Sequence, residues 1–134
     1  MTDLIANETL PGDTWLAERS WTHPTWTVSE LEAAKRGRTI SVVLPALNEQ
    51  ETIASVIETI APMLGGLVDE LIVLDSGSSD ETEIRAIAAG ARVVSRERAV
   101  PELAPRPGKG EVLWRSLAAT TGDNWCEEQA LAPL

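Results

Sequence analysis

The chain has 134 residues with 11 basic and 21 acidic side chains, a formal net charge of -10, and one cysteine. This length fits one domain at most, and the charge argues against nucleic acid or an anionic membrane as a partner. Cys126 has no second cysteine to pair with, and no apolar stretch is long enough to span a membrane. Because the first ten residues also lack a basic leader, we expect a cytoplasmic protein with no membrane span.

The N-terminal segment, residues 1–20, shows no sustained hydrophobic period and is expected to be a loose arm. Trp15, Trp21 and Trp26 follow one another closely in this part of the chain. Their indole rings either pack on the domain and pin the arm, which is the favoured interpretation, or form a contact with a second chain.

A helix from Thr27 to about Arg36 is predicted next, because Thr27 and Glu30 have the spacing of a capping box. Leu31 and Ala34 are expected to face inward.

The central segment runs from Thr39 to Ile60. Thr39 to Leu44 is a short β-branched run typical of a strand buried on both faces, and Pro45 ends it. Asn48 is expected to cap the following helix, with Glu51 completing a capping box. The apolar residues of that helix recur at helical spacing: Ile53, Val56, Ile57 and Ile60.

Two further strands are predicted, at Glu70–Leu74 and Ala91–Ser95. Between them lies a helix capped by Asp80. Glu83 is expected to be the acidic residue of its first turn. Its expected apolar face consists of Ile84, Ile87 and Ala88. A last helix is predicted over Glu111–Thr120, whereas residues 124–134 show neither a buried run nor alternation and predict no fourth strand. Strands that alternate with helices predict an α/β fold with a parallel sheet.

Loops that follow parallel strands open on one edge of a sheet, so Glu49 and the Asp75–Gly77 loop should lie side by side. A carboxylate and a hydroxyl there suit a ligand with hydrogen-bond donors, such as ribose hydroxyls or a pyrimidine N–H. Helix capping and first-turn charge explain Glu49 and Asp80 equally well, and an Asx turn is a strong competing explanation for Asp75. Neither glycine-rich phosphate motif occurs, so phosphates would need Lys109, Arg106 or a metal.

Three segments occur in a characteristic order: Val43-Leu-Pro-Ala-Leu-Asn-Glu49, Val73-Leu-Asp-Ser-Gly-Ser-Ser-Asp-Glu-Thr82 and Arg106-Pro-Gly-Lys-Gly-Glu111. Together they resemble the actinobacterial glucosyl-3-phosphoglycerate synthase family, retaining glycosyltransferases of GT-A fold that transfer glucose from UDP-glucose to 3-phosphoglycerate with Mg²⁺. The resemblance implies a Rossmann-like three-layer α/β/α domain with a mostly parallel sheet. It also implies a UDP-sugar pocket, whose expected residues are Pro45, Ala46, Leu47, Glu49, Ser76 and Lys109, with Asp75 and Gly110 as possible additions.

The resemblance covers residues 21–123, and residues 124–134 form a divergent tail. The family continues there with a strand that ends in an Asp-x-Asp metal motif, which this tail does not have. Glu127 and Glu128 are adjacent and do not replace two carboxylates spaced to hold one ion. We therefore expect a truncated GT-A domain with no metal site and no catalytic residue, which binds UDP or UDP-glucose at most and does not transfer glucose alone.

Two alternatives stay open. The chain could be a noncatalytic module that docks on an intact homologue or on a second copy of itself through the tryptophan arm and a free sheet edge. It could also be a nonfunctional fragment that folds poorly, since uncovered apolar surface and an unpaired strand favour aggregation.

Overall fold

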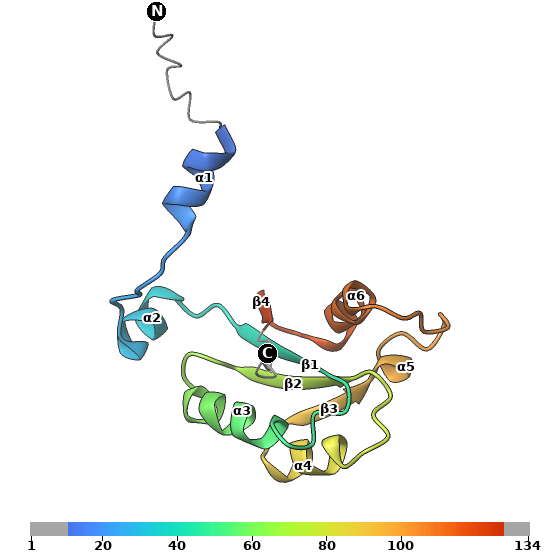
Figure 1. Cartoon of the computed structure of the whole chain (residues 1–134). Coiled ribbons are helices and arrows are strands. Elements are labelled where there is room, and N and C mark those ends of the chain that lie inside the picture. Colours follow the sequence, from blue (N-terminus) through green and yellow to red (C-terminus); the bar gives the residue numbers. More distant parts are fainter. Residues whose placement is uncertain (1–10, 128–134) are drawn as a thin grey trace, which may run out of the picture.

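The computed structural model describes residues 11–127 and is built on a four-stranded sheet with helices on both faces (Figure 1). The strands lie in the order β3-β2-β1-β4, and every neighbouring pair is parallel. Their bounds are β1 Ile40–Ala46, β2 Glu70–Asp75, β3 Arg92–Ser95 and β4 Asn124–Glu127. The expected three-layer α/β architecture with a parallel sheet is confirmed.

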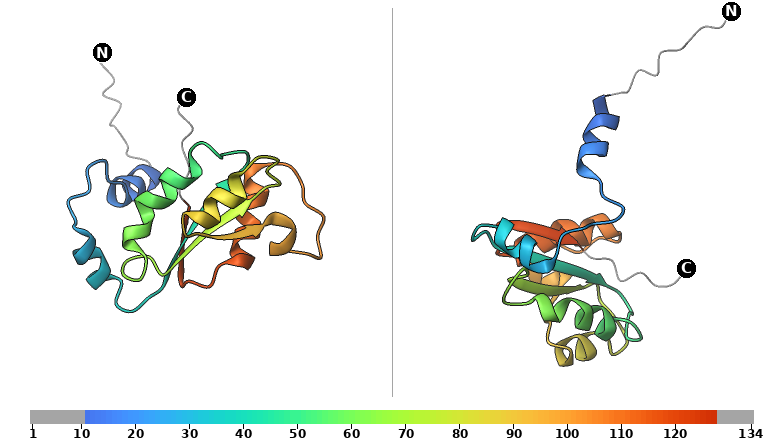
Figure 2. Two further views of the ribbon diagram at one scale, coloured as in Figure 1. Left: turned by 90° about the horizontal axis from the view of Figure 1, so that it is seen from below. Right: turned by 90° about the vertical axis from the view of Figure 1, so that its left-hand side faces the viewer.

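The helices that cover the sheet divide between its two faces, as Figures 1 and 2 show. One face carries α3 (Ile53–Ile60), followed by the short 3-10 helix η1 (Ala61–Met63), and α4 (Thr82–Ala88). The other face carries α6 (Lys109–Ala119), with the single turn α5 (Arg96–Ala99) beside it. None of the helices in the described part of the chain is long and apolar enough to cross a membrane.

Two apolar clusters explain why the strand sequences are continuously hydrophobic. Val42, Leu44 and Ala46 of β1 pack with α3 and α4, whereas Val43 of the same strand packs with Val112 of α6. Successive strand residues point to opposite faces, so a strand covered on both faces needs an apolar residue at every position.

The prediction that no strand follows Gly122 is wrong for Asn124–Glu127, which pairs with β1 as the edge strand β4. The residues at the start of β4 bind it to the residue that precedes β1. Asp123 Oδ2 accepts hydrogen bonds from the backbone N (2.9 Å) and hydroxyl (3.0 Å) of Thr39, and the Asn124 N–H donates to the Thr39 carbonyl at 2.9 Å. The half-buried Trp125 packs on the α6 side of the sheet. These contacts with β1 override the weak strand pattern of the segment.

The exposed faces of two helices also differ from the predictions. The capping box of Thr27 and Glu30 is confirmed at the start of α2 (Val28–Ala34), but no residue of α2 is buried. In α4 the buried residues are Thr82 and Ala86. Ile84 and Ile87, expected to face inward, are 70% and 56% exposed.

The arm is partly helical. Pro11–Arg19 forms α1, which projects from the body of the sheet in Figure 1 and in the right-hand view of Figure 2, and residues 1–10 lie outside the described part. Trp15, Trp21 and Trp26 are 56%, 60% and 47% exposed, so the interpretation that they pin the arm to the domain is wrong for this structure. Trp21 and Trp26 contact each other edge to face, with centroids 5.3 Å apart. Contact with a second chain stays a prediction.

The carboxylate of Glu70 joins β1, β2, β3 and the segment that leads into β4. It accepts hydrogen bonds from Ser41 Oγ (2.9 Å), Arg92 Nη2 (2.6 Å) and the N–H (3.0 Å) and hydroxyl (2.8 Å) of Thr121. Burial alone would raise the pKa of Glu70, but the hydrogen bonds from Thr121, Arg92 and Ser41 outweigh it and hold the pKa below its ordinary 4.5.

We expect Glu70→Gln to lower the free energy of unfolding at pH 7 by about 1 to 2 kcal/mol, because four donor groups on three residues lose a charged acceptor. The unfolded carboxyl binds its proton more tightly than the folded one, so this stabilisation is present above pH 4.5 and is lost as the pH falls through the lower folded pKa. Urea titrations at several pH values should therefore show the two proteins converging in acid. Glu58→Gln, at an exposed position of α3, is the control and should behave as wild type at every pH.

Gly122 should not tolerate a side chain. A Cβ at this position would lie 2.5 Å from Ser41 Oγ and 2.8 Å from the Ser41 backbone nitrogen. We expect Gly122→Ala to displace the entry to β4 and to cost about 1 to 3 kcal/mol in urea unfolding. In contrast Gly110→Ala, in α6, meets no atom within 4 Å and should leave stability unchanged or slightly raised, by up to about 1 kcal/mol.

Candidate functional site

The loops after β1 and β2 lie side by side at the carboxyl edge of the sheet, as predicted, and they are hydrogen-bonded to each other. The Asn48 N–H donates to Ser78 Oγ at 2.9 Å, and the Ser79 N–H donates back to Asn48 Oδ1 at 2.9 Å. The Glu49 N–H donates to the Thr82 hydroxyl at 2.8 Å. The two loops therefore form one rigid rim.

Asn48 has a different role from the predicted helix cap. Its φ is 53°, in the left-handed region that asparagine tolerates better than most residues. Helix α3 begins later, at Ile53, with Thr52 as its N-cap. The side chain of Asn48 is consequently used to hold the neighbouring loop and not the helix.

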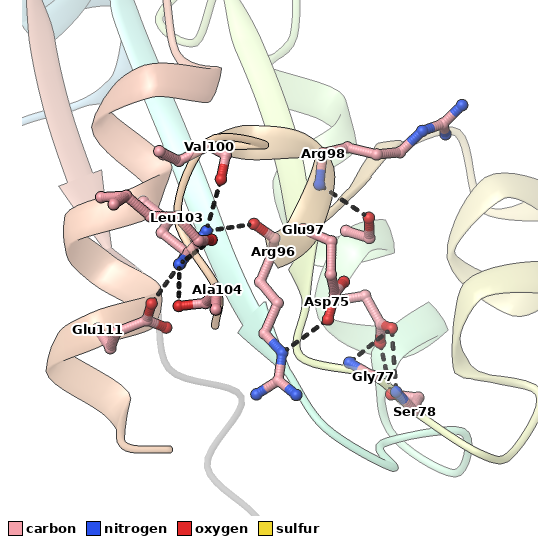
Figure 3. A network of polar contacts seen from close by, with 12 residues as sticks. Asp75, Gly77, Ser78, Arg96, Glu97, Arg98, Val100, Leu103, Ala104 and Glu111 are labelled. Atoms are coloured by element: carbon pink, nitrogen blue, oxygen red, sulfur yellow. Dashed lines mark hydrogen bonds and ion pairs between the residues drawn. The ribbon is translucent and has the colours of Figure 1, made fainter. Parts of the chain in front are cut away.

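Asp75 and Asp80 stabilise their own turns. Asp75 is buried, and its carboxylate accepts hydrogen bonds from the N–H groups of Gly77 (3.1 Å) and Ser78 (3.0 Å) and from the Ser78 hydroxyl (Figure 3). Burial would raise the pKa of Asp80, but hydrogen bonds from Thr82 and the Gln50 N–H lower it overall. The Asx turn expected as the alternative at Asp75 is thus present, whereas the prediction that Asp80 caps the following helix is wrong, because the N-cap of α4 is Glu81.

A cavity of about 410 Å³ opens at this rim. It is bounded by the end of β1, the loop after β2, the start of α5 and the first turn of α6. Its walls contain all six residues of the expected main set: Pro45, Ala46, Leu47, Glu49, Ser76 and Lys109. The possible additions Asp75 and Gly110 do not line it, and Arg106 lines a separate cavity beside Trp114.

Four lining residues were not predicted: Arg96, Pro107, Gly108 and Val112. Arg96 directly follows β3, whose last residue Ser95 pairs with Asp75, so the rule that identified the first two loops also applies to it. With Lys109 it brings two cationic side chains to a cavity whose lining includes one carboxylate, that of Glu49. These two cations make the local electrostatic potential more favourable for an anionic ligand than the net negative charge of the chain would.

The loop that carries Arg96 is held by Arg115 of α6, which is 1% exposed. Nη1 of Arg115 donates to the carbonyls of Arg96 and Val100, both at 3.0 Å, and Nη2 donates to those of Leu103 (2.9 Å) and Ala104 (3.1 Å), as Figure 3 shows. Nε pairs with Glu111, and this hydrogen bond is the main cause of the lowered pKa of Glu111. A fully satisfied guanidinium therefore fixes one wall of the cavity.

The described residues of the cavity do not fit a divalent metal. Among the described residues that line the cavity, Glu49 supplies the one carboxylate, and its Oε2 already accepts a hydrogen bond from Thr52 Oγ1 at 2.9 Å. Residues 11–127 contain no group of three or more His, Cys, Asp or Glu side chains that could hold an ion. We therefore assign no chemical step to a metal at these residues.

Comparison with known proteins identifies the family. The model of the family described as "Glycosyl transferase family 2" matches residues 41–125, from β1 to β4. The chain belongs to glycosyl transferase family 2. Among the relatives of this family 2 chain, glucosyl-3-phosphoglycerate synthase of Mycolicibacterium smegmatis is 77% identical over 112 residues, which is 84% of this chain and 37% of the relative. The enzyme of Mycolicibacterium paratuberculosis is 70% identical over 129 residues, or 90% of this chain and 39% of the relative.

Solved structures of family relatives agree with the fold. A crystal structure of glucosyl-3-phosphoglycerate synthase from Mycobacterium tuberculosis in complex with Mg²⁺ and UDP is 71% identical, with a TM-score of 0.79, and the match covers 82% of this chain and 39% of that one. A complex of the same enzyme with Mn²⁺, UDP and glucosyl-3-phosphoglycerate gives a TM-score of 0.79 at 70% identity, over 83% of this chain and 40% of that one. The resemblance to glucosyl-3-phosphoglycerate synthases is thus confirmed, and this family 2 chain spans about two fifths of their length.

We expect Arg115→Leu to destabilise the protein by about 3 to 5 kcal/mol, because it leaves four carbonyls and the carboxylate of Glu111 without their partner. Urea denaturation measures this change. Arg98→Leu, at an exposed position on α5, is the control and should change the free energy of unfolding by less than about 0.5 kcal/mol. Equal stability of the two variants would show that Arg115 does not hold the loop.

Proposed function

We propose that the cavity at the carboxyl edge of the sheet binds the uridine diphosphate part of a UDP-sugar. The supporting observation is that Pro45, Ala46, Leu47, Glu49, Ser76 and Lys109, taken from three separate segments of the chain, line one cavity. The strand order adds support. Ligands of open α/β sheets bind outside the carboxyl ends of the strands near the point where the strand order reverses. Here that point lies between β1 and β4, and the end of β1 lines the cavity.

The roles follow from the chemistry of the lining. Pro45 and Leu47 supply apolar contact for a flat base, and Ser76 supplies a hydroxyl that can donate or accept a hydrogen bond. Glu49 accepts hydrogen bonds from ribose hydroxyls through the lone pairs that Thr52 leaves open. Lys109 places its ammonium toward the diphosphate, where a point charge suits phosphate oxygens.

Glucosyl transfer to 3-phosphoglycerate is the activity in the names of the relatives, and this chain spans only 37% to 39% of their length. We propose nucleotide binding as the function of residues 11–127 by themselves. The donor is proposed to be UDP-glucose because crystals of the Mycobacterium tuberculosis relative contain it. In this proposal the chain has no transferase activity alone.

Isothermal titration calorimetry with UDP tests the proposal. Wild type should bind UDP, and Glu49→Gln should weaken binding by about 1.5 to 3 kcal/mol, because a neutral amide replaces a charged acceptor. Glu51→Gln, an exposed carboxylate in the same loop, is the control and should bind as wild type.

Two results would contradict the proposal. Absence of UDP binding by the folded wild-type protein would remove the nucleotide from this cavity. Equal binding by the Glu49 and Glu51 variants would show that the nucleotide binds elsewhere. Transfer of glucose from UDP-glucose to 3-phosphoglycerate by the isolated chain would separately disprove the statement that it has no transferase activity.

A further inference from the structure

We propose that Arg96 selects uracil over cytosine in this cavity, an inference that rests on the proposed binding of UDP. Arg96 is neither in the expected site nor in a recognisable nucleotide motif. It lines the cavity from α5, the turn that follows β3.

Arg96 lies next to the turn expected to face the base. A Cβ added to Gly77 would lie 3.7 Å from Arg96 Nη2, which places the end of the guanidinium beside the Ser76–Gly77 turn. Ser76 lines the same cavity and supplies the hydroxyl that the proposed function places beside the base. A base within reach of Ser76 is therefore within reach of Arg96, on the β3 side of the cavity and away from β4.

Two hydrogen bonds hold Arg96 in place and leave the N–H groups of its two terminal nitrogens available to a ligand. Its Nε donates to Glu97 Oε1 at 3.0 Å, and its own carbonyl accepts from the buried Arg115 at 3.0 Å. Both terminal nitrogens extend beyond the Glu97 contact in Figure 3, and no described residue accepts a hydrogen bond from them. The side chain is 27% exposed, so water screens it only in part.

The chemistry of the two pyrimidines gives the selectivity. Uracil presents a carbonyl oxygen at position 4, whereas cytosine presents an amino group there. In this proposal the guanidinium of Arg96 faces position 4 of the base. Arginine has only donors, so at that position it pairs with the uracil oxygen and opposes the cytosine amino group, while the hydroxyl of Ser76 can turn to suit either base. A site that loses a hydrogen bond and meets two facing donors rejects the wrong ligand strongly.

The experiment compares UDP, CDP and uridine by isothermal titration calorimetry, with and without Mg²⁺. Wild type should bind UDP at least about tenfold more tightly than CDP. Arg96→Ala should weaken the binding of UDP and of uridine by about tenfold. It should leave the affinity for CDP unchanged or higher, so that the preference for UDP disappears. Arg96→Lys, which keeps the charge but loses the planar fork, should retain only part of the preference.

Arg98→Ala is the matched control. Arg98 lies two residues away on the same turn, and its side chain points away from that of Arg96 in Figure 3. This variant should keep the UDP affinity and the preference of wild type. Circular dichroism melts of each variant establish that it is folded.

The outcomes separate this inference from the proposed function. If wild type does not bind UDP, the proposed function fails. If wild type binds UDP and Arg96→Ala weakens UDP and CDP equally with no effect on uridine, Arg96 contacts phosphate, and the inference about the base is overturned. An unchanged ratio of UDP to CDP affinity in Arg96→Ala also overturns it.

Discussion

The parallel pairing of β1 with β2 is the constraint on which the rest of the structure depends. Ala46 pairs with Asp75, so both strands end at the same level and both following loops leave the sheet at one edge. Pairing of Ser95 with Asp75 brings β3 to that level as well. The cavity is thus a property of strand register, and the side chains that line it are placed there by the backbone hydrogen bonds of the strands that end at the rim.

Much of this organisation can be predicted from sequence because it follows from local rules. The β-branched runs fix the buried strands, the alternation of strands and helices fixes their parallel direction, and the adjacency of the first two loops follows directly. The strand β4 is different. It depends on contacts between Asp123 and Thr39, 84 residues apart, and no local pattern in Asn124–Glu127 indicates them.

The failures at the site have the same origin. Asn48 and Thr82 look like ordinary residues of a helix start, but hydrogen bonds between the two loops decide what they do. Thr82 is held inward by Asp80 and by the Glu49 N–H, which turns α4 so that Ile84 faces outward despite its apolar side chain. Arg96 escapes a motif search because its position depends on the end of β3 and on an arginine 19 residues later.

That arginine has a consequence for how the protein acquires its binding site. Arg115 lies 11 to 19 positions after the carbonyls that it holds, so the whole proline-rich loop is synthesised before its anchor. The two loops after β1 and β2 need no such partner, because their hydrogen bonds join segments already synthesised. One wall of the cavity can therefore form early, while the wall that carries Arg96 closes only when α6 has docked.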